Sequence, residues 1–72
     1  MPHIAVMLYP GRSPEAKAEM AEKLRACLVE AAGWKPSDIS VSFEGIEAEH
    51  FSEEVHKKVR EEDLVLTSDY IH

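Results

Sequence analysis

A long segment with helical periodicity lies between two short segments with strand periodicity, and this order sets the architecture of most of the chain. In residues 14–32, apolar side chains recur at steps of three and four and form one stripe along a helix. Ser13 is a suitable N-cap, Pro14 suits the first helical position and Gly33 is a natural end. The pattern therefore predicts a helix over 14–32, with Cys27 on its buried side.

The two flanking segments, 3–9 and 39–44, read as strands because their side chains alternate between two faces. Gly45 ends or bends the second segment. Both faces of the first segment are largely apolar, so we expect both to be covered. Two strands joined through one helix form a β-α-β unit, in which the strands are parallel and the crossover is right-handed. The sequence thus predicts an α/β fold built on a single β-α-β unit.

The length of the chain limits how stable this unit is by itself. With 72 residues, the chain predicts one domain that spans 1–72. Two strands and one helix bury a limited share of their surface and are too few to be stable alone. Cys27 is the only cysteine, so no disulfide within the chain can stabilise the fold. We therefore expect oligomerisation to complete the fold.

The C-terminal third of the chain carries weaker signals. Ser52 is a candidate cap for a short C-terminal helix over 53–62, and residues 64–66 are strand-like. Residues 67–72, called the C-terminal tail below, have no clear periodicity. We expect this tail to lie on a neighbouring subunit or to be loose.

Charge and composition exclude several classes of function. The formal net charge is -6, whereas nucleic-acid binding needs a basic patch, so no nucleic-acid partner is expected. No apolar run approaches the roughly 20 residues needed to span a bilayer, so no membrane partner is expected. A single thiol and the lack of a secretory signal predict a cytoplasmic protein. The spacing of the four histidines matches no metal-ligand motif, so no metal site is predicted.

Several sequence features together resemble the 4-oxalocrotonate tautomerase superfamily, whose small members are built on a β-α-β unit. These features are Met1-Pro2 before the first strand, Gly11-Arg12-Ser13 at the turn into the helix, and His50-Phe51 after the second strand. The resemblance covers nearly the whole chain in element order. The length after Phe51 resembles the dimeric, YdcE-like branch, which implies a homo-oligomer that is a dimer, with a hexamer as the alternative.

The resemblance implies a cofactor-independent tautomerase that moves a proton between the enol and keto forms of a small 2-oxo acid. Pro2, made N-terminal by removal of Met1, would be the catalytic base. Arg12 would bind the substrate carboxylate, and Phe51 would form part of a hydrophobic wall. Many members have a second arginine in the second strand, where this chain has Ser40. Ser40 can donate a hydrogen bond but no charge, so a monocarboxylate such as the enol of phenylpyruvate fits better than a dicarboxylate.

The chemistry of a terminal proline agrees with this role. A proton shuttle needs a group whose pKa lies near the working pH, and a free α-amine starts with a pKa of about 8. Apolar surroundings and a nearby cation such as Arg12 would both lower the pKa of the Pro2 amine. While Met1 is attached, however, the Pro2 nitrogen is an amide and is not basic.

Two alternative functions stay open at this point. On the same scaffold, a protonated Pro2 would act as an acid in water addition to, or dehalogenation of, unsaturated acids, with Glu44 as the candidate that activates water. If Met1 is retained, the chain is a small oligomeric binding protein without catalysis. Arg60 is a further candidate anchor for a carboxylate, in place of the missing strand arginine.

Overall fold

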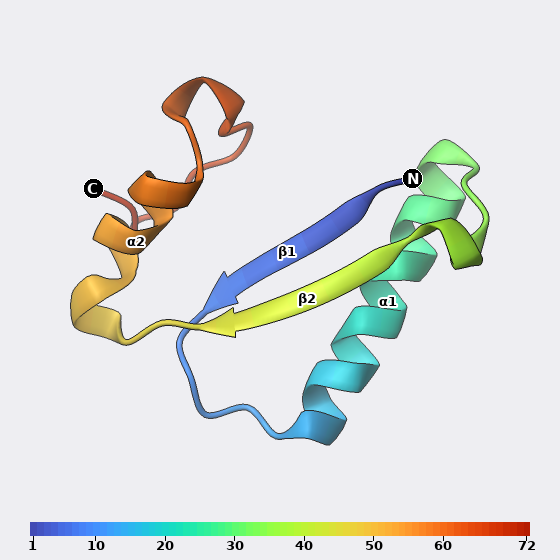
Figure 1. The fold of residues 1–72 in the computed structure, drawn as a ribbon, viewed down its shortest axis with the longest axis horizontal. Coiled ribbons are helices and arrows are strands. Elements are labelled where there is room, and N and C mark those ends of the chain that lie inside the picture. Colours follow the sequence, from blue (N-terminus) through green and yellow to red (C-terminus); the bar gives the residue numbers. More distant parts are fainter.

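The computed structural model describes residues 1–72 and contains a two-stranded sheet and two α-helices (Figure 1). The elements in chain order are β1 (His3–Leu8), α1 (Pro14–Ala32), β2 (Ser40–Gly45) and α2 (Phe51–Lys58), with short 3-10 helices at Pro36–Asp38, Ala48–His50 and Glu61–Asp63. β1 and β2 pair in parallel, from His3 beside Ser40 to Leu8 beside Gly45. The predicted β-α-β unit with parallel strands and a short C-terminal helix is therefore confirmed.

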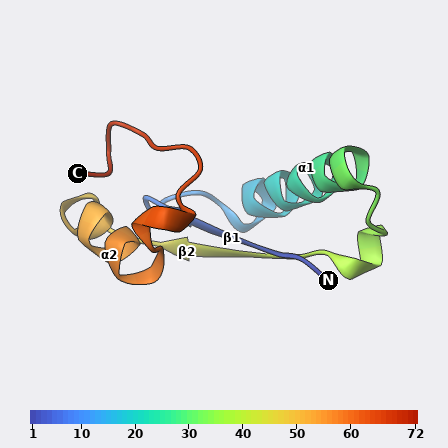
Figure 2. The same ribbon diagram turned by 90° about the horizontal axis from the view of Figure 1, so that it is seen from above.

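α1 covers one face of the sheet, and the opposite face is open (Figure 2). This outer face carries alternate residues of the two strands, which are His3, Ala5 and Met7 from β1 and Ser40, Ser42 and Glu44 from β2. His3 lies between two serines, with Nδ1 2.7 Å from Ser40 Oγ and Nε2 2.9 Å from Ser42 Oγ. Within one chain only the face of β1 beneath α1 is covered, and cover of the other face stays a prediction for the assembled protein.

Both predicted ends of α1 are confirmed, and each has a clear physical cause. The Ser13 hydroxyl accepts a hydrogen bond from the Ala16 N–H at 3.1 Å, which satisfies one free donor of the first turn. Gly33 has a φ of 77°, and its N–H donates to the Val29 carbonyl at 2.9 Å. Glycine adopts this left-handed conformation at a helix end with little strain, because it has no Cβ. Cys27, expected to be buried on this helix, is exposed.

The C-terminal helix differs from the sequence prediction at both ends. α2 begins at Phe51 and ends at Lys58, earlier than the predicted 53–62, because Val59 is extended. Ser52 is not its N-cap, since the helix has no side-chain cap hydrogen bond. The predicted strand at 64–66 is also absent, and Val65 is 91% exposed.

The C-terminal tail folds back onto α2 of its own chain. The His72 N–H donates to Ser52 Oγ at 2.8 Å, and the Ser52 hydroxyl lies 3.2 Å from the His72 main-chain oxygen. His56 Nε2 donates to the same oxygen at 2.6 Å. Ser52 is the second residue of α2, after the N-cap residue His50, and its hydroxyl is bonded to the tail.

The chain buries very little of its own apolar surface. Only Ile39, Ile46 and Val55 are buried among the 72 residues. The radius of gyration is 13.4 Å, and the molecule measures 36 × 31 × 17 Å. A compact chain of this length has a radius of gyration of roughly 11 Å. The single chain is thus a flat, extended unit with almost no interior.

Candidate active site

Two of the predicted site residues, Pro2 and Ser40, lie together where β1 and β2 begin. The Ser40 N–H donates to the Pro2 carbonyl at 3.2 Å, which extends the parallel pairing by one residue. Pro2 is half-buried, and the preceding Met1 is 96% exposed. The Ser40 hydroxyl contacts His3 on the outer face of the sheet. This end of the molecule therefore combines the chain start with a hydroxyl and an imidazole.

The other two predicted residues, Arg12 and Phe51, lie at the opposite end of β1. They line the same open cavity of about 510 Å³, which is within the size range of small-ligand pockets. Most of its lining is apolar or aromatic, and the complete set is Met7, Leu8, Tyr9, Arg12, Met20, Phe51, Ser68 and Tyr70. The structure thus brings Arg12 and the predicted hydrophobic wall into one site.

Arg12 is the only charged residue that lines this cavity. Its guanidinium makes no ion pair and no hydrogen bond within the chain, unlike Arg25, which binds Glu22 at 2.6 Å. Arg12 follows Gly11, whose φ of 120° lies in a region that favours glycine, and this turn precedes α1. A free guanidinium beside apolar walls is well suited to hold a carboxylate through two parallel hydrogen bonds.

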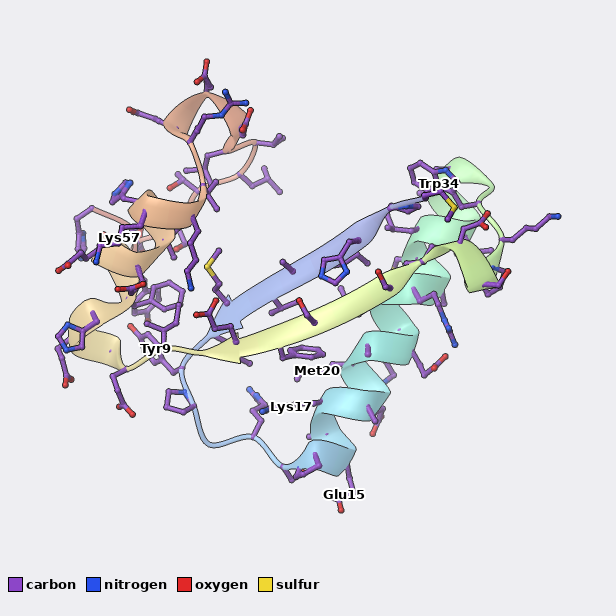
Figure 3. All side chains as sticks on the ribbon, in the orientation of Figure 1. Tyr9, Glu15, Lys17, Met20, Trp34 and Lys57 are labelled. Atoms are coloured by element: carbon purple, nitrogen blue, oxygen red, sulfur yellow. The ribbon has the colours of Figure 1, made fainter.

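Three aromatic rings form one side of the cavity. The Tyr9 and Phe51 rings are 5.2 Å apart between centroids, in an edge-to-face arrangement. Tyr9 meets Tyr70 in the same way at 6.1 Å. Edge-to-face contacts are a favourable geometry for aromatic pairs and fix the orientation of the rings. Figure 3 shows Tyr9 between the end of β1 and α2.

Within one chain, the two halves of the predicted site are far apart. β1 contains six residues, and at about 3.3 Å per residue its ends are separated by roughly 20 Å. Figure 1 shows the chain start at one end of β1 and the connection to α1 at the other. A single chain therefore does not bring Pro2 and Ser40 into contact with Arg12 and Phe51.

The other candidate residues are engaged elsewhere. Glu44 forms an ion pair with Lys58. Arg60 is bound to Asp63, with Nε 3.0 Å from Oδ2, and does not line the cavity. Arg60 therefore does not compete with Arg12 for a carboxylate in the cavity.

Six of the eight residues that line the cavity were not among the predicted site residues. Tyr9 was predicted only as a strand residue, and Met20 only as part of an apolar stripe. Ser68 and Tyr70 lie in a tail that shows no periodicity, so no sequence pattern indicated their position. No group of three or more His, Cys, Asp or Glu side chains is arranged to hold a metal ion. The helices are also too short or too polar to cross a membrane.

Comparison with known proteins assigns this β-α-β unit to a family. Residues 2–60 match the family described as Tautomerase enzyme. A probable tautomerase from Xylella fastidiosa (strain 9a5c) is 34% identical over 56 residues, which is 78% of this chain and 68% of that protein.

Solved structures give the same relationship. TomN, a 4-oxalocrotonate tautomerase homologue in the tomaymycin biosynthetic pathway, has a TM-score of 0.65 and 34% identity over 69% of this chain and 77% of its own. N2, a member of the 4-oxalocrotonate tautomerase family, has a TM-score of 0.67 and 27% identity. The match covers 71% of this chain and 80% of N2. YwhB, a homologue of 4-oxalocrotonate tautomerase, shares the fold, with a TM-score of 0.65 and 24% identity. The match covers 93% of this chain and 100% of YwhB. This chain therefore belongs to the tautomerase family, within the 4-oxalocrotonate tautomerase superfamily.

Proposed function

We propose that the protein is a cofactor-independent tautomerase that catalyses 1,3-proton transfer between the enol and keto forms of a small 2-oxo acid. The observation that carries this proposal is the unpaired Arg12 guanidinium in an otherwise apolar and aromatic cavity. Such a cavity suits an acid with one carboxylate and an apolar body. Membership of the tautomerase family supplies the reaction class, and the family match begins at Pro2.

The proton would be moved by the amine of Pro2 after Met1 is removed. Met1 is 96% exposed, so a processing enzyme has access to it. The freed secondary amine takes the proton from the enol hydroxyl. The electron pair left on oxygen forms the keto carbonyl, and the electron pair of the C=C double bond shifts to the neighbouring carbon. The resulting ammonium returns a proton to that carbon. The amine is thus regenerated, and no cofactor is required.

The separation between Pro2 and Arg12 leads us to propose that the site is completed by a second copy of the chain. The two-stranded sheet leaves the outer edge of β1 unpaired, and unpaired edges recruit further strands. If two β1 strands meet antiparallel across a two-fold axis, the start of one lies beside the end of the other. Pro2 of one copy then faces Arg12 and Phe51 of the other. A homodimer is the smallest assembly with this property, and a hexamer built from such dimers keeps it.

In this assembly each residue has a separate role. Arg12 binds the substrate carboxylate. Phe51 and Tyr9 contact the apolar part of the substrate and exclude water from it. Ser40, beside Pro2, can donate a hydrogen bond but offers no second charge. The substrate is therefore expected to carry one carboxylate, as in the enol of phenylpyruvate.

The direct test is ketonisation of phenylenolpyruvate, followed by its ultraviolet absorbance, on protein whose Met1 removal is verified by mass spectrometry. We expect Pro2→Ala to lower kcat/KM by a factor on the order of 10²–10⁴, the usual contribution of acid–base catalysis. Arg12→Ala should mainly raise KM. Arg25→Ala is the matched control, because Arg25 is paired on α1 and lies outside the cavity. Equal rates for wild type and Pro2→Ala would refute the proposal.

Neither alternative gains support of its own. Water addition or dehalogenation needs a base to activate water, and the candidate Glu44 is held by Lys58. Retention of Met1 would favour a non-catalytic binding protein, because the Pro2 nitrogen is then an amide. Mass spectrometry that finds Met1 on every chain would therefore exclude Pro2 catalysis before any kinetic measurement.

A further inference from the structure

The C-terminal tail, residues 67–72, contributes two residues to the Arg12 cavity. Ser68 and Tyr70 both line it, together with the Tyr9 and Phe51 rings. The tail lies beyond residues 2–60, the segment that matches the family. The tail therefore adds to this cavity a wall that the matched segment of the chain does not supply.

The tail is held in place by hydrogen bonds at its end and by one within it. Ser52 and His56, both on α2, bind the main chain of His72 at 2.6–3.2 Å. Nearer the cavity, the Tyr70 N–H donates to Ser68 Oγ at 3.3 Å, which closes a tight turn. Tyr70 is thus presented from a segment that is anchored to the same helix as Phe51, and its position is defined relative to the cavity.

Tyr70 contributes little to the interior of the chain. Its side chain is 63% exposed, and its contact with Tyr9 is made at 6.1 Å between ring centroids. The Tyr70 hydroxyl makes no hydrogen bond within the chain. A purely structural tyrosine would bury more of its ring or bond its hydroxyl. Instead, an exposed aromatic surface faces the same cavity as the Arg12 guanidinium.

We propose that Tyr70 is a specificity-determining residue, which contacts the apolar group of the acid whose carboxylate Arg12 binds. This inference rests on the proposed function and specifies which acids the site prefers. Because Arg12 and Tyr70 line one cavity of about 510 Å³, an acid with an aryl or bulky alkyl group reaches both, whereas a short acid reaches only Arg12. The ring of Tyr70, and not its hydroxyl, provides the contact.

The test compares two unreactive ligands, 3-phenylpropionate and propionate, by NMR titration of the verified, Met1-free protein. Tyr70→Ala should weaken 3-phenylpropionate binding about two- to tenfold, the range of one aromatic contact, and leave propionate binding unchanged. Tyr70→Phe should bind both ligands as the wild type does. Asp69→Ala is the matched control, because Asp69 is on the same tail, outside the cavity, and makes no ion pair.

A second variant tests the anchoring of the tail without altering the cavity wall. Ser52→Ala removes two of the hydrogen bonds to His72, so it should lower the 3-phenylpropionate preference in the same direction as Tyr70→Ala. Equal weakening of both ligands by Tyr70→Ala, no change in either, or no binding of either ligand by the wild type would overturn the inference.

The titration is independent of turnover, so the two proposals fail separately. If phenylenolpyruvate is not ketonised but Tyr70→Ala shifts the ligand preference, only the catalytic proposal is lost. If ketonisation is fast and Tyr70→Ala leaves the preference unchanged, only the role of Tyr70 is lost.

Discussion

The thermal unfolding of this protein should depend strongly on its concentration, because the single chain exposes more surface than a compact monomer. The solvent-accessible surface is 5644 Å² for 8.1 kDa, whereas a compact monomer of this mass exposes roughly 4,500 Å². The excess of roughly 1,100 Å² exceeds the ~800 Å² that each partner buries in an interface of standard size. Association is therefore expected to supply much of the stability.

The size of the effect follows from the chain length. At about 0.7 kcal/mol per residue, unfolding 72 residues absorbs roughly 50 kcal/mol per chain. When folding is coupled to assembly, tenfold dilution shifts the equilibrium by about 1.4 kcal/mol per association step. With these values, each tenfold dilution is expected to lower the midpoint temperature of unfolding by about 5 °C for a dimer and by about 8 °C for a hexamer.

Circular dichroism melts over a hundredfold range of concentration measure this slope. A midpoint that falls about 10 °C across the range indicates a dimer, and a fall of about 17 °C indicates a hexamer. A midpoint that stays constant to within about 1 °C would show that the monomer is the stable unit. That result would also remove the basis for a site shared between two copies.

Two smaller predictions concern the stability of the chain, each measured by urea unfolding at fixed protein concentration. Ile39→Val shortens one of the three buried side chains and should lower the free energy of unfolding by about 0.5–1.5 kcal/mol. Val65→Ala, at a 91% exposed position, should change it by less than about 0.5 kcal/mol, and equal effects of the two substitutions would contradict the assigned core. Ser13→Ala removes the hydrogen bond to the Ala16 N–H and should lower the free energy of unfolding by about 1 kcal/mol, and no change would mean that the cap does not stabilise α1.

Local signals in the sequence were sufficient for the β-α-β unit. The cap at Ser13, the stop at Gly33 and the alternation in both strands are properties of neighbouring residues, and each agrees with the structure. The family features were also local, since Pro2 and Arg12 are recognised by their places at the two ends of the first strand.

The C-terminal part could not be predicted because its structure depends on contacts distant in sequence. Ser52 resembles a helix cap, but its hydroxyl binds His72, twenty residues away. Residues 64–66 have strand-like side chains but no partner strand within the chain, so they form no ladder. Tyr70 joins the cavity through the same long-range clamp, which no periodic pattern indicates.

Mixing two impaired variants tests most directly whether Pro2 of one copy acts with Arg12 of another. Pro2→Ala and Arg12→Ala proteins are unfolded together in equal amounts, refolded and assayed with phenylenolpyruvate well below the wild-type KM, where both variants are impaired. In a mixed dimer, one site combines an intact Pro2 with an intact Arg12, so random mixing should restore about a quarter of the wild-type activity. If the mixture is no more active than its two components while wild type refolds to full activity, the shared site is contradicted.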